Sequence, residues 1–262
     1  GRERQRALRH DTAPRGKQRT RRILRILPPS MTQQLILDLL PAPAPTLDNF
    51  VVGENGVAID ALRQLRPGRA IYLWGASGAG RSHLLRALAS APLARYFDAQ
   101  SSAADIRGMA SAETMPCRLI AVDDIHRLDE EAQAALFALY NRWRETSAGE
   151  QAFALLGSGD RSPRAMPLRE DLRTRLGWDL VFGLEQLSDD DRAQALRTQA
   201  AERGLQFSPE VIGWILTHYA RDMGRLSALV DALDRYSLEK HRAITLPLLK
   251  DLLASSRPPK EN

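Results

Sequence analysis

The sequence predicts an α/β fold in which helices sandwich a parallel sheet, followed by a small helical domain. Apolar strand-like runs alternate with helix-like runs through the middle of the chain, as in parallel α/β proteins. A glycine-rich loop joins the first of these strands to a helix, which is the context that a phosphate-binding loop needs. After Ser188 the strand signals stop and only helical patterns follow.

Composition bounds the class of protein. The chain has 262 residues, of which 44% are hydrophobic, so it can bury a sizeable core. Its one cysteine, Cys117, is expected in the core. A single cysteine excludes intrachain disulfides and cysteine-based zinc sites, and it fits a reducing cytoplasm. No apolar run approaches the ~20 residues that a membrane span needs, so no membrane partner is expected.

Positive charge is concentrated in residues 1–30, which hold ten basic and two acidic side chains. Because the whole chain has a net charge of +5, the remainder has a net charge of −3. That remainder gives no electrostatic case for nucleic acid. The basic leader could be a nucleic-acid arm, a targeting peptide, or upstream sequence translated from a mis-called start. We favour the last interpretation, because Met31 is the first methionine and begins a self-sufficient unit.

A proline-rich spacer at 41–45 separates a short apolar segment, Gln34 to Leu40, from the rest of the chain. Alternating proline makes the spacer stiff and extended, so the segment should stand away from the body. The expected organisation is a leader at 1–30, an arm with its spacer at 31–46, an α/β domain at 47–186, a helical lid at 187–255 and a tail at 256–262.

The elements of the α/β domain follow in order. Residues 118–122 are apolar almost throughout, as a central parallel strand should be. We predict strands at about 70–74, 94–98, 117–123, 152–157 and 179–183, and helices at about 56–64, 82–91, 102–111, 129–146 and 169–176.

Four helices are expected in the second domain. Ser188 precedes three aspartates, which is typical of a helix N-cap and an acidic first turn. A second helix begins at Ser208, and a fourth runs from Leu246 to about Leu253. The third places Leu226, Leu229, Val230 and Leu233 on one face, at helical spacing.

Residues 75–82 form the most specific motif, a phosphate-binding loop in which arginine replaces the usual lysine. Glycines let backbone N–H groups turn toward phosphate oxygens, and the following helix adds its dipole. Ser82 can reach a Mg²⁺ ion held on the phosphates. Arg81 keeps the charge but is a planar fork, so it is not a neutral replacement. The expected phosphate-binding residues are Gly75, Ala76, Ser77, Gly78, Ala79, Gly80, Arg81 and Ser82.

Acidic residues follow two further apolar strands. In nucleotide-binding folds, the first carboxylate at such a strand end holds Mg²⁺ and the next can polarise the attacking water. We therefore expect Asp123 at the metal and Asp124 in the catalytic role, whereas without the loop both would merely end a strand. Asp160 could lie at the γ-phosphate end of the site, or at a plain strand-to-turn junction.

This ordered set resembles the AAA+ ATPases, and within them the DnaA-like branch and its Hda family of regulatory inactivators. The resemblance covers nearly all of residues 32–254, and Hda proteins also carry arginine where the loop usually has lysine. The most telling pieces are Tyr72 to Gly75, Gly78 to Leu85, Leu139 to Arg142, Gly159 to Arg161 and Arg173 to Trp178.

The resemblance implies roles that spacing alone does not assign. Asp160 would be the first sensor, Arg221 the second sensor, and Arg175 an arginine finger offered to a neighbouring subunit. Residues 34–39 match the hexapeptide with which the family binds the sliding clamp, the β subunit of DNA polymerase III. The clamp-binding residues would be Gln34, Leu35, Leu37 and Leu39.

The implied function is negative regulation of replication initiation. The protein would bind ADP or ATP with Mg²⁺ and dock on the DNA-loaded clamp. It would stimulate ATP hydrolysis by DnaA, with weak or no ATPase activity of its own. The sequence leaves open whether the protein forms a homodimer. Two alternatives remain: an initiator or helicase loader that acts directly on DNA, and a self-contained ATPase. The eight residues after Ala254 are too few for a DNA-binding helix-turn-helix domain, so direct sequence-specific DNA binding is not expected.

Overall fold

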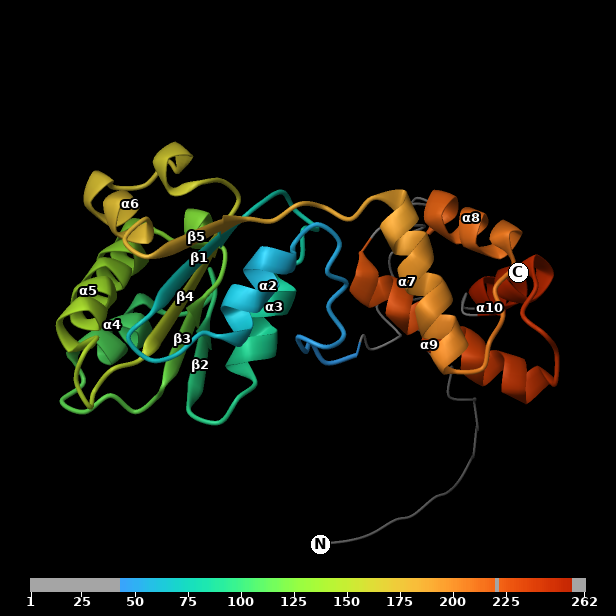
Figure 1. Cartoon of the computed structure of the whole chain (residues 1–262), viewed down its shortest axis with the longest axis horizontal. Helices are drawn as coiled ribbons and strands as arrows, with labels where there is room; N and C mark the ends of the chain where they lie inside the picture. The colour runs from blue at the N-terminus through green and yellow to red at the C-terminus, as the bar shows by residue number, and fades with distance from the viewer. Residues whose placement is uncertain (1–42, 220–221, 256–262) are drawn as a thin grey trace, which may run out of the picture.

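The computed structural model describes residues 43–219 and 222–255, which form two parts lying side by side (Figure 1). One part is a sheet with helices on both faces, and the other is a bundle of helices. The chain passes from the sheet to the bundle directly after the last strand. The predicted fold class, a helix-covered parallel sheet followed by a helical lid, is confirmed.

The sheet has the strand order β2-β3-β4-β1-β5, and each neighbouring pair is parallel. The first strand of the chain is therefore internal, between β4 and β5. Since parallel strands end at the same edge, the residues that follow β1, β3 and β4 come together there. The strands are β1 (Ala70–Trp74), β2 (Ala94–Phe97), β3 (Leu119–Val122), β4 (Ala154–Gly159) and β5 (Leu180–Gly183).

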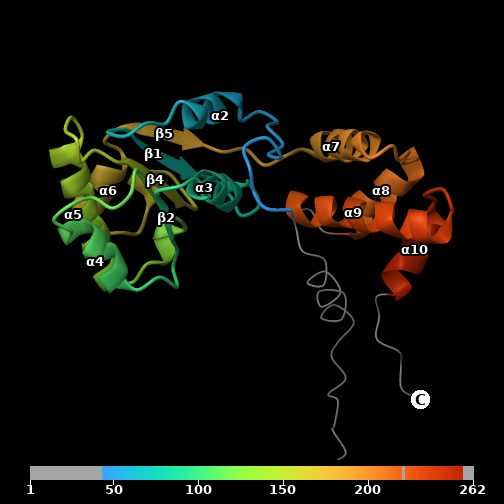
Figure 2. The ribbon, with the colours of Figure 1, turned by 90° about the horizontal axis from the view of Figure 1, so that it is seen from below.

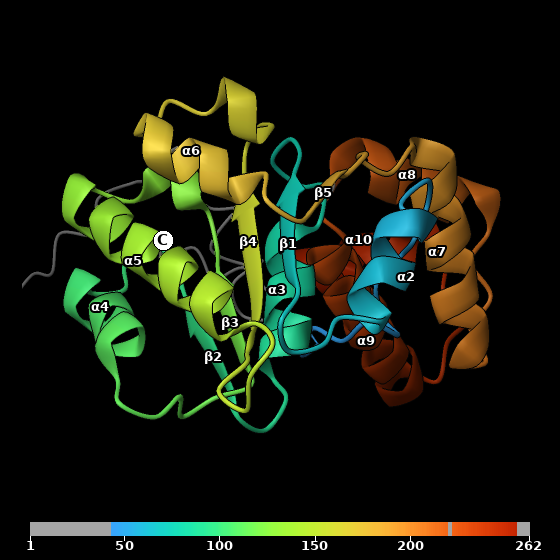
Figure 3. The ribbon, with the colours of Figure 1, turned by 60° about the vertical axis from the view of Figure 1, so that its left-hand side comes forward.

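Helices cover both faces of this sheet (Figure 3). On β1, Ile71 and Leu73 pack with α2 and α3, whereas Ala70 and Tyr72 pack with the helices of the other face. This alternation follows from the two-residue period of a strand. The α2–α3 face is the one turned toward the helical bundle. The helices are α2 (Gly56–Arg63), α3 (Arg81–Ala89), α4 (Ala103–Ser111), α5 (Glu130–Thr146) and α6 (Glu170–Leu176), with the short 3-10 turns η1 (Ile125–Arg127) and η2 (Pro163–Ala165).

Two predicted strands differ from the structure by two residues at one end or both, and two others by one residue. The third is shorter than 117–123, and Cys117 is buried just before it. The fourth begins and ends two residues later than predicted, so that Ser158 and Gly159 belong to it. Pairing explains the shift, because Trp74 at the end of β1 lies opposite Gly159. Apolar pattern alone does not show how far a ladder with a neighbouring strand extends.

The second part is a four-helix bundle with its own core. Ser188 caps its first helix through a capping box with Asp191, and Ser208 and Asp222 cap the next two. Figure 2 shows the first and third helices running alongside each other. Leu226, Leu229, Val230 and Leu233 are all buried, as predicted. The helices are α7 (Asp189–Glu202), α8 (Pro209–His218), α9 (Met223–Lys240) and α10 (Leu246–Ser255).

Within residues 43–219 and 222–255, no helix is both long enough and apolar enough to cross a membrane.

Candidate nucleotide-binding site

The glycine-rich loop lies between β1 and α3, at the edge where the parallel strands end. Gly80 precedes α3 with φ of 90°, and a Cβ atom there would meet the ring of Phe50 at 2.5 Å, so only glycine fits. The first hydrogen bond of the helix is donated by the Leu84 amide to the Gly80 carbonyl. The amides of residues 81–83 consequently have no intrahelical partner and are available to an anion.

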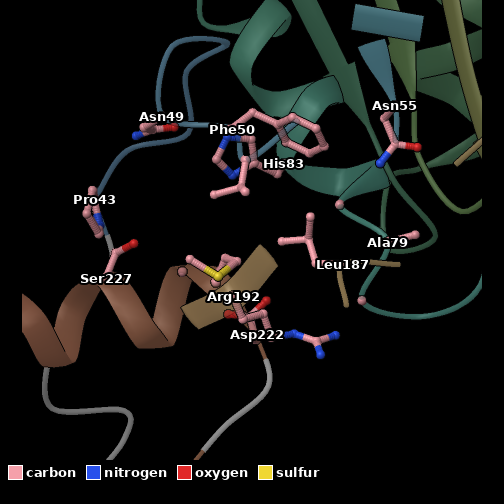
Figure 4. Close-up of a pocket in the computed structure, with 15 residues that line it drawn as sticks. Pro43, Asn49, Phe50, Asn55, Ala79, His83, Leu187, Arg192, Asp222 and Ser227 are labelled. Atoms are coloured by element: carbon pink, nitrogen blue, oxygen red, sulfur yellow. The ribbon is translucent and has the colours of Figure 1, made fainter. Parts of the chain in front are cut away.

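A pocket separates this loop from the helical lid (Figure 4). The loop contributes Gly78, Ala79 and Gly80, whereas α7 and the start of α9 contribute polar side chains. Arg221, the predicted second sensor, lies outside the described residues. Asp222, which follows it, caps α9 and lines the pocket. The lining also includes Phe50, Asn55, His83, Leu187, Arg192 and Ser227.

Phe50 and Asn55 line the pocket from outside the motifs that the sequence singled out, and His83 lies within the segment 78–85 but had no predicted role. His83 Nε2 lies 2.8 Å from the Thr46 carbonyl, and its ring lies against Phe50, with centroids 5.5 Å apart. Asn55 is buried and exchanges two hydrogen bonds with the backbone of Glu185. These contacts pin the segment before α2 and the segment after β5 beside the loop. No local pattern marks Phe50 or Asn55 as site residues, because their partners are distant in sequence.

Arg81 lies on the first turn of α3, and its side chain is only 10% exposed. Its Nη2 lies 3.2 Å from Oδ1 of Asp124. Arg127 and His126 also face Asp124, at 3.7 and 3.9 Å. Asp124 itself has a left-handed backbone, with φ of 49°. The predicted catalytic carboxylate is therefore held in an ion pair with the predicted phosphate-binding arginine.

Asp123 is buried below the same edge, at 3% exposure. Tyr96 Oη donates to its Oδ2 at 2.7 Å, and the hydroxyl of Ser158 donates to its Oδ1. Burial, and then the bond to Asp123, raise the pKa of Tyr96, so its hydroxyl remains a donor. Tyr96 and Ser158 were not expected from the sequence, because they belong to two other strands. Ser82, Asp123 and Asp124 line a common cavity of about 160 Å³.

The magnesium assignment to Ser82 and Asp123 stays a prediction. The two side chains do line one cavity, but the Asp123 oxygens already accept hydrogen bonds from protein groups. Among the described residues, no group of three or more His, Cys, Asp or Glu side chains is arranged to hold a metal ion.

Asp160, the predicted first sensor, follows the end of β4. Arg161 holds its carboxylate through Nη2, at 2.6 Å, and through Nε. The pKa of Asp160 is lowered, first by that hydrogen bond and also by the charges of His126 and Arg81. Asp160 is thus close enough to the loop arginine to feel its field, but it does not line the cavity of Asp123.

Arg175 lies on α6, away from the pocket residues. Its guanidinium carbon lies 3.8 Å from the ring centroid of Phe137 and 4.8 Å from that of Trp178. Nε donates to Asn141 at 2.8 Å, and Nη1 donates to the Asp171 carbonyl at 3.0 Å. Within the described part of the chain Nη2 has no hydrogen-bond partner. The side chain is therefore held in one pose with a donor edge left over.

The four predicted clamp-binding residues, Gln34, Leu35, Leu37 and Leu39, lie outside the described residues, so their assignment stays a prediction.

Solved structures with the same fold include a replication initiation protein and a branch migration motor. Domain III of the Thermotoga maritima replication initiation protein DnaA is 21% identical, with a TM-score of 0.62, and the match covers 84% of this chain and 99% of that one. AMPPCP-bound DnaA from Aquifex aeolicus is 21% identical, with a TM-score of 0.58, over 75% of this chain and 67% of that one. The Thermotoga maritima RuvB branch migration motor is 17% identical, with a TM-score of 0.57, over 84% and 73%. Together with the strand order, the loop and the lid, these matches show that the chain has the AAA+ fold that DnaA also has.

Two sequence comparisons narrow that class. The model of the Hda lid domain matches residues 189–253. An uncharacterized protein of Haemophilus influenzae is 32% identical over an alignment of 242 residues, and the match covers 85% of this chain and 99% of that protein. The chain belongs to the Hda family, the DnaA-related branch that the sequence motifs indicated.

Proposed function

We propose that this protein is a regulator of replication initiation that binds an adenine nucleotide and stimulates ATP hydrolysis by the initiator DnaA. The observation that carries the proposal is the pose of Arg175, a charged side chain fixed on α6 with Nη2 unpaired in the described chain. An arginine supplied in trans stabilises negative charge that develops on a transferring phosphoryl group. DnaA-ATP would become DnaA-ADP, and initiation would be held back.

The nucleotide, ADP or ATP, would lie in the pocket between the loop and the lid. Support comes from the amides of residues 81–83 and from Gly78, Ala79 and Gly80 in the pocket wall. The solved DnaA structure that shares this fold was obtained with AMPPCP bound, which supports binding of an adenine nucleotide. Ala76, Ser77 and Gly75 complete the loop, and Asp160 and Arg221 would sense the nucleotide as the family resemblance implies.

The protein's own hydrolysis should be weak. A carboxylate that polarises water must be free to accept its proton, and Asp124 faces Arg81 at 3.2 Å and Arg127 at 3.7 Å. The ATP that is hydrolysed would belong to DnaA, with Arg175 as the catalytic group.

The second partner is the sliding clamp, reached through residues 34–39 as an extended peptide. Leu37 and Leu39 would fill an apolar pocket, and burying one such side chain is worth roughly 1.5–3 kcal/mol. Docking on the DNA-loaded clamp would bring the regulator close to DnaA, with no sequence-specific DNA contact of its own.

The test is DnaA-bound ATP hydrolysis, measured with and without this protein and with and without DNA-loaded clamp. We expect DnaA-ADP to accumulate faster only when protein and loaded clamp are both present. A variant with Gln34, Leu37 and Leu39 changed to alanine should lose clamp binding and stimulation while it keeps nucleotide binding. Stimulation that is absent in the complete mixture, or unaltered in the triple variant, would contradict the proposal. Hydrolysis by this protein alone would favour a self-contained ATPase.

A further inference from the structure

The cavity lined by Ser82, Asp123 and Asp124 is where a nucleotide-binding loop protein would hold Mg²⁺ beside the phosphates. The side chains around it show whether such an ion fits. Mg²⁺ requires oxygen ligands in near-octahedral geometry and retains several waters, so at least one carboxylate has to present free lone pairs to it.

Asp123 has few lone pairs left. A carboxylate can accept about four hydrogen bonds, and three protein donors already reach this one. Tyr96 Oη donates to Oδ2 at 2.7 Å. The Ser158 hydroxyl and the Asp124 amide both donate to Oδ1. The Asp123 carboxylate therefore keeps about one acceptor position for a metal ion or its water.

The negative charge of Asp124 is balanced by two arginine side chains of the same chain. Arg81 lies 3.2 Å from Oδ1 and Arg127 3.7 Å from Oδ2. A metal ion placed against this carboxylate would have to displace, or be repelled by, a guanidinium that cannot lose its proton. Oδ1 of Asp124 has no hydrogen-bond partner among the described residues, but two guanidinium groups lie against this carboxylate. Because their charge opposes a cation there, and Asp123 keeps only about one acceptor position, the residues do not fit a resident ion.

Arginine side chains line the same cavity. Arg86 and Arg127 form part of its wall together with Ser82. The guanidinium carbon of Arg86 lies 5.4 Å from the centroid of the Tyr96 ring, which directs it along the wall that Tyr96 forms. Guanidinium groups bind phosphate oxygens through paired N–H donors and remain charged at every accessible pH. They can supply the positive charge that a metal ion supplies elsewhere.

We propose that this site binds nucleotide phosphates without Mg²⁺, with loop amides and arginines supplying the counter-charge, and that Tyr96 excludes the ion by occupying Asp123. The inference rests on the proposed nucleotide site. Tyr96 is a positioning residue: it acts on Asp123 and need not touch the phosphates.

Isothermal titration of the full chain with ADP, in EDTA and in Mg²⁺, tests the first half. We expect the two dissociation constants to agree within about twofold, since no ion-binding step contributes to either. A loss of more than about tenfold in EDTA would overturn the proposal. So would a bound Mn²⁺ signal in paramagnetic resonance when Mn²⁺ replaces Mg²⁺ beside ADP on the unaltered protein. Failure to bind ADP in either buffer would overturn it together with the nucleotide site.

Tyr96→Phe tests the second half, because it keeps the ring and frees Asp123 Oδ2. The variant should bind ADP about fivefold more tightly in Mg²⁺ than in EDTA, while Tyr236→Phe on α9 should behave like the unaltered chain. Equal affinities for Tyr96→Phe in both buffers would reject the role of Tyr96. The assay of DnaA-bound ATP hydrolysis tests the proposed function separately from this inference. ADP binding that needs no metal ion, without stimulation of DnaA, would reject the regulatory function and leave this inference standing.

Discussion

The phosphate loop and α6 each hold an arginine on which the proposed function depends, and they hold it in different ways. Arg81 is 10% exposed and ion-paired with Asp124. Arg175 is half-buried, lies over the ring of Phe137 and donates to Asn141. A carboxylate neutralises the charge that it holds, whereas an aromatic ring and an amide orient a guanidinium and leave its net charge intact. The charge of Arg81 is thus balanced within the chain, although its Nη1 has no hydrogen-bond partner among the described residues, whereas Arg175 keeps its net charge for a partner.

The sharpest way to break this comparison is Arg175→Ala, for which we expect the largest effect. Arginine fingers contribute on the order of 10³–10⁵ in rate in well-studied GTPases. The family resemblance implies slow hydrolysis by DnaA, so we expect a smaller loss of stimulation, of about 10². The measurement is DnaA-ADP formation in the presence of DNA-loaded clamp, with ADP titration of the variant to show that its own nucleotide site survives.

The matched control is Arg173→Ala, which removes the same charge from the same helix. Residues two apart on a helix point away from each other, and α6 includes both arginines. Stimulation should fall less for this variant. Equal losses for the two variants would mean that the charge of α6, and not the pose of Arg175, matters.

The Arg81 side of the comparison is tested by Asp124→Asn, for which the effect should be on stability. Asparagine tolerates the left-handed backbone of this position, so the change mainly removes the charge. Removing one partner of a buried pair costs about 3–5 kcal/mol. Because Asp124 is 24% exposed, we expect a smaller loss, of about 2 kcal/mol, in the free energy of unfolding measured with urea.

Asp60→Asn serves as its control. Asp60 lies 3.7 Å from Arg63 on α2, with side chains that are 70% and 52% exposed. Pairs exposed to this degree contribute about 0–1 kcal/mol. If Asp124→Asn lowers the free energy of unfolding no more than Asp60→Asn does, the ion pair between Arg81 and Asp124 does not hold Arg81 in place.

The smallest effect concerns Asp160, whose pKa is lowered by Arg161. A carboxyl group with a lowered pKa stabilises the fold above its ordinary pKa of 3.8, and that contribution is lost as pH falls through the lowered value. Arg161→Ala should therefore raise the pKa of Asp160. The free energy of unfolding of this variant should then fall less steeply as the pH is lowered below the ordinary pKa of the carboxyl group. The change should be small, because solvent screens a pair whose side chains are 51% and 29% exposed. NMR titration of the carboxyl group measures it, and an unchanged pKa would assign the shift to other groups.

Much of the chain was predictable because its cues are local. The alternation of apolar runs predicted every strand and helix of the sheet part to within a few residues, and Ser188 and Ser208 predicted two helix starts through their capping chemistry. The loop at 75–82 was recognisable for the same reason, since its glycines and the flanking elements are contiguous. The clamp-binding segment and Arg221 lie outside the described residues and remain predictions.

What the sequence by itself determined is the set of elements, their parallel class and the loop that opens α3. Only the tertiary structure decided the partners of the charged groups. The order β2-β3-β4-β1-β5 brings Tyr96 and Ser158 to the two oxygens of Asp123, and the turn after β3 carries Asp124 to Arg81. A hydrogen bond depends on distances of a few tenths of an ångström between residues tens of positions apart. Local periodicity carries no information about such distances. It could place the carboxylates at one edge of the sheet, but it could not show which side chains donate hydrogen bonds to their oxygens or pair with their charge.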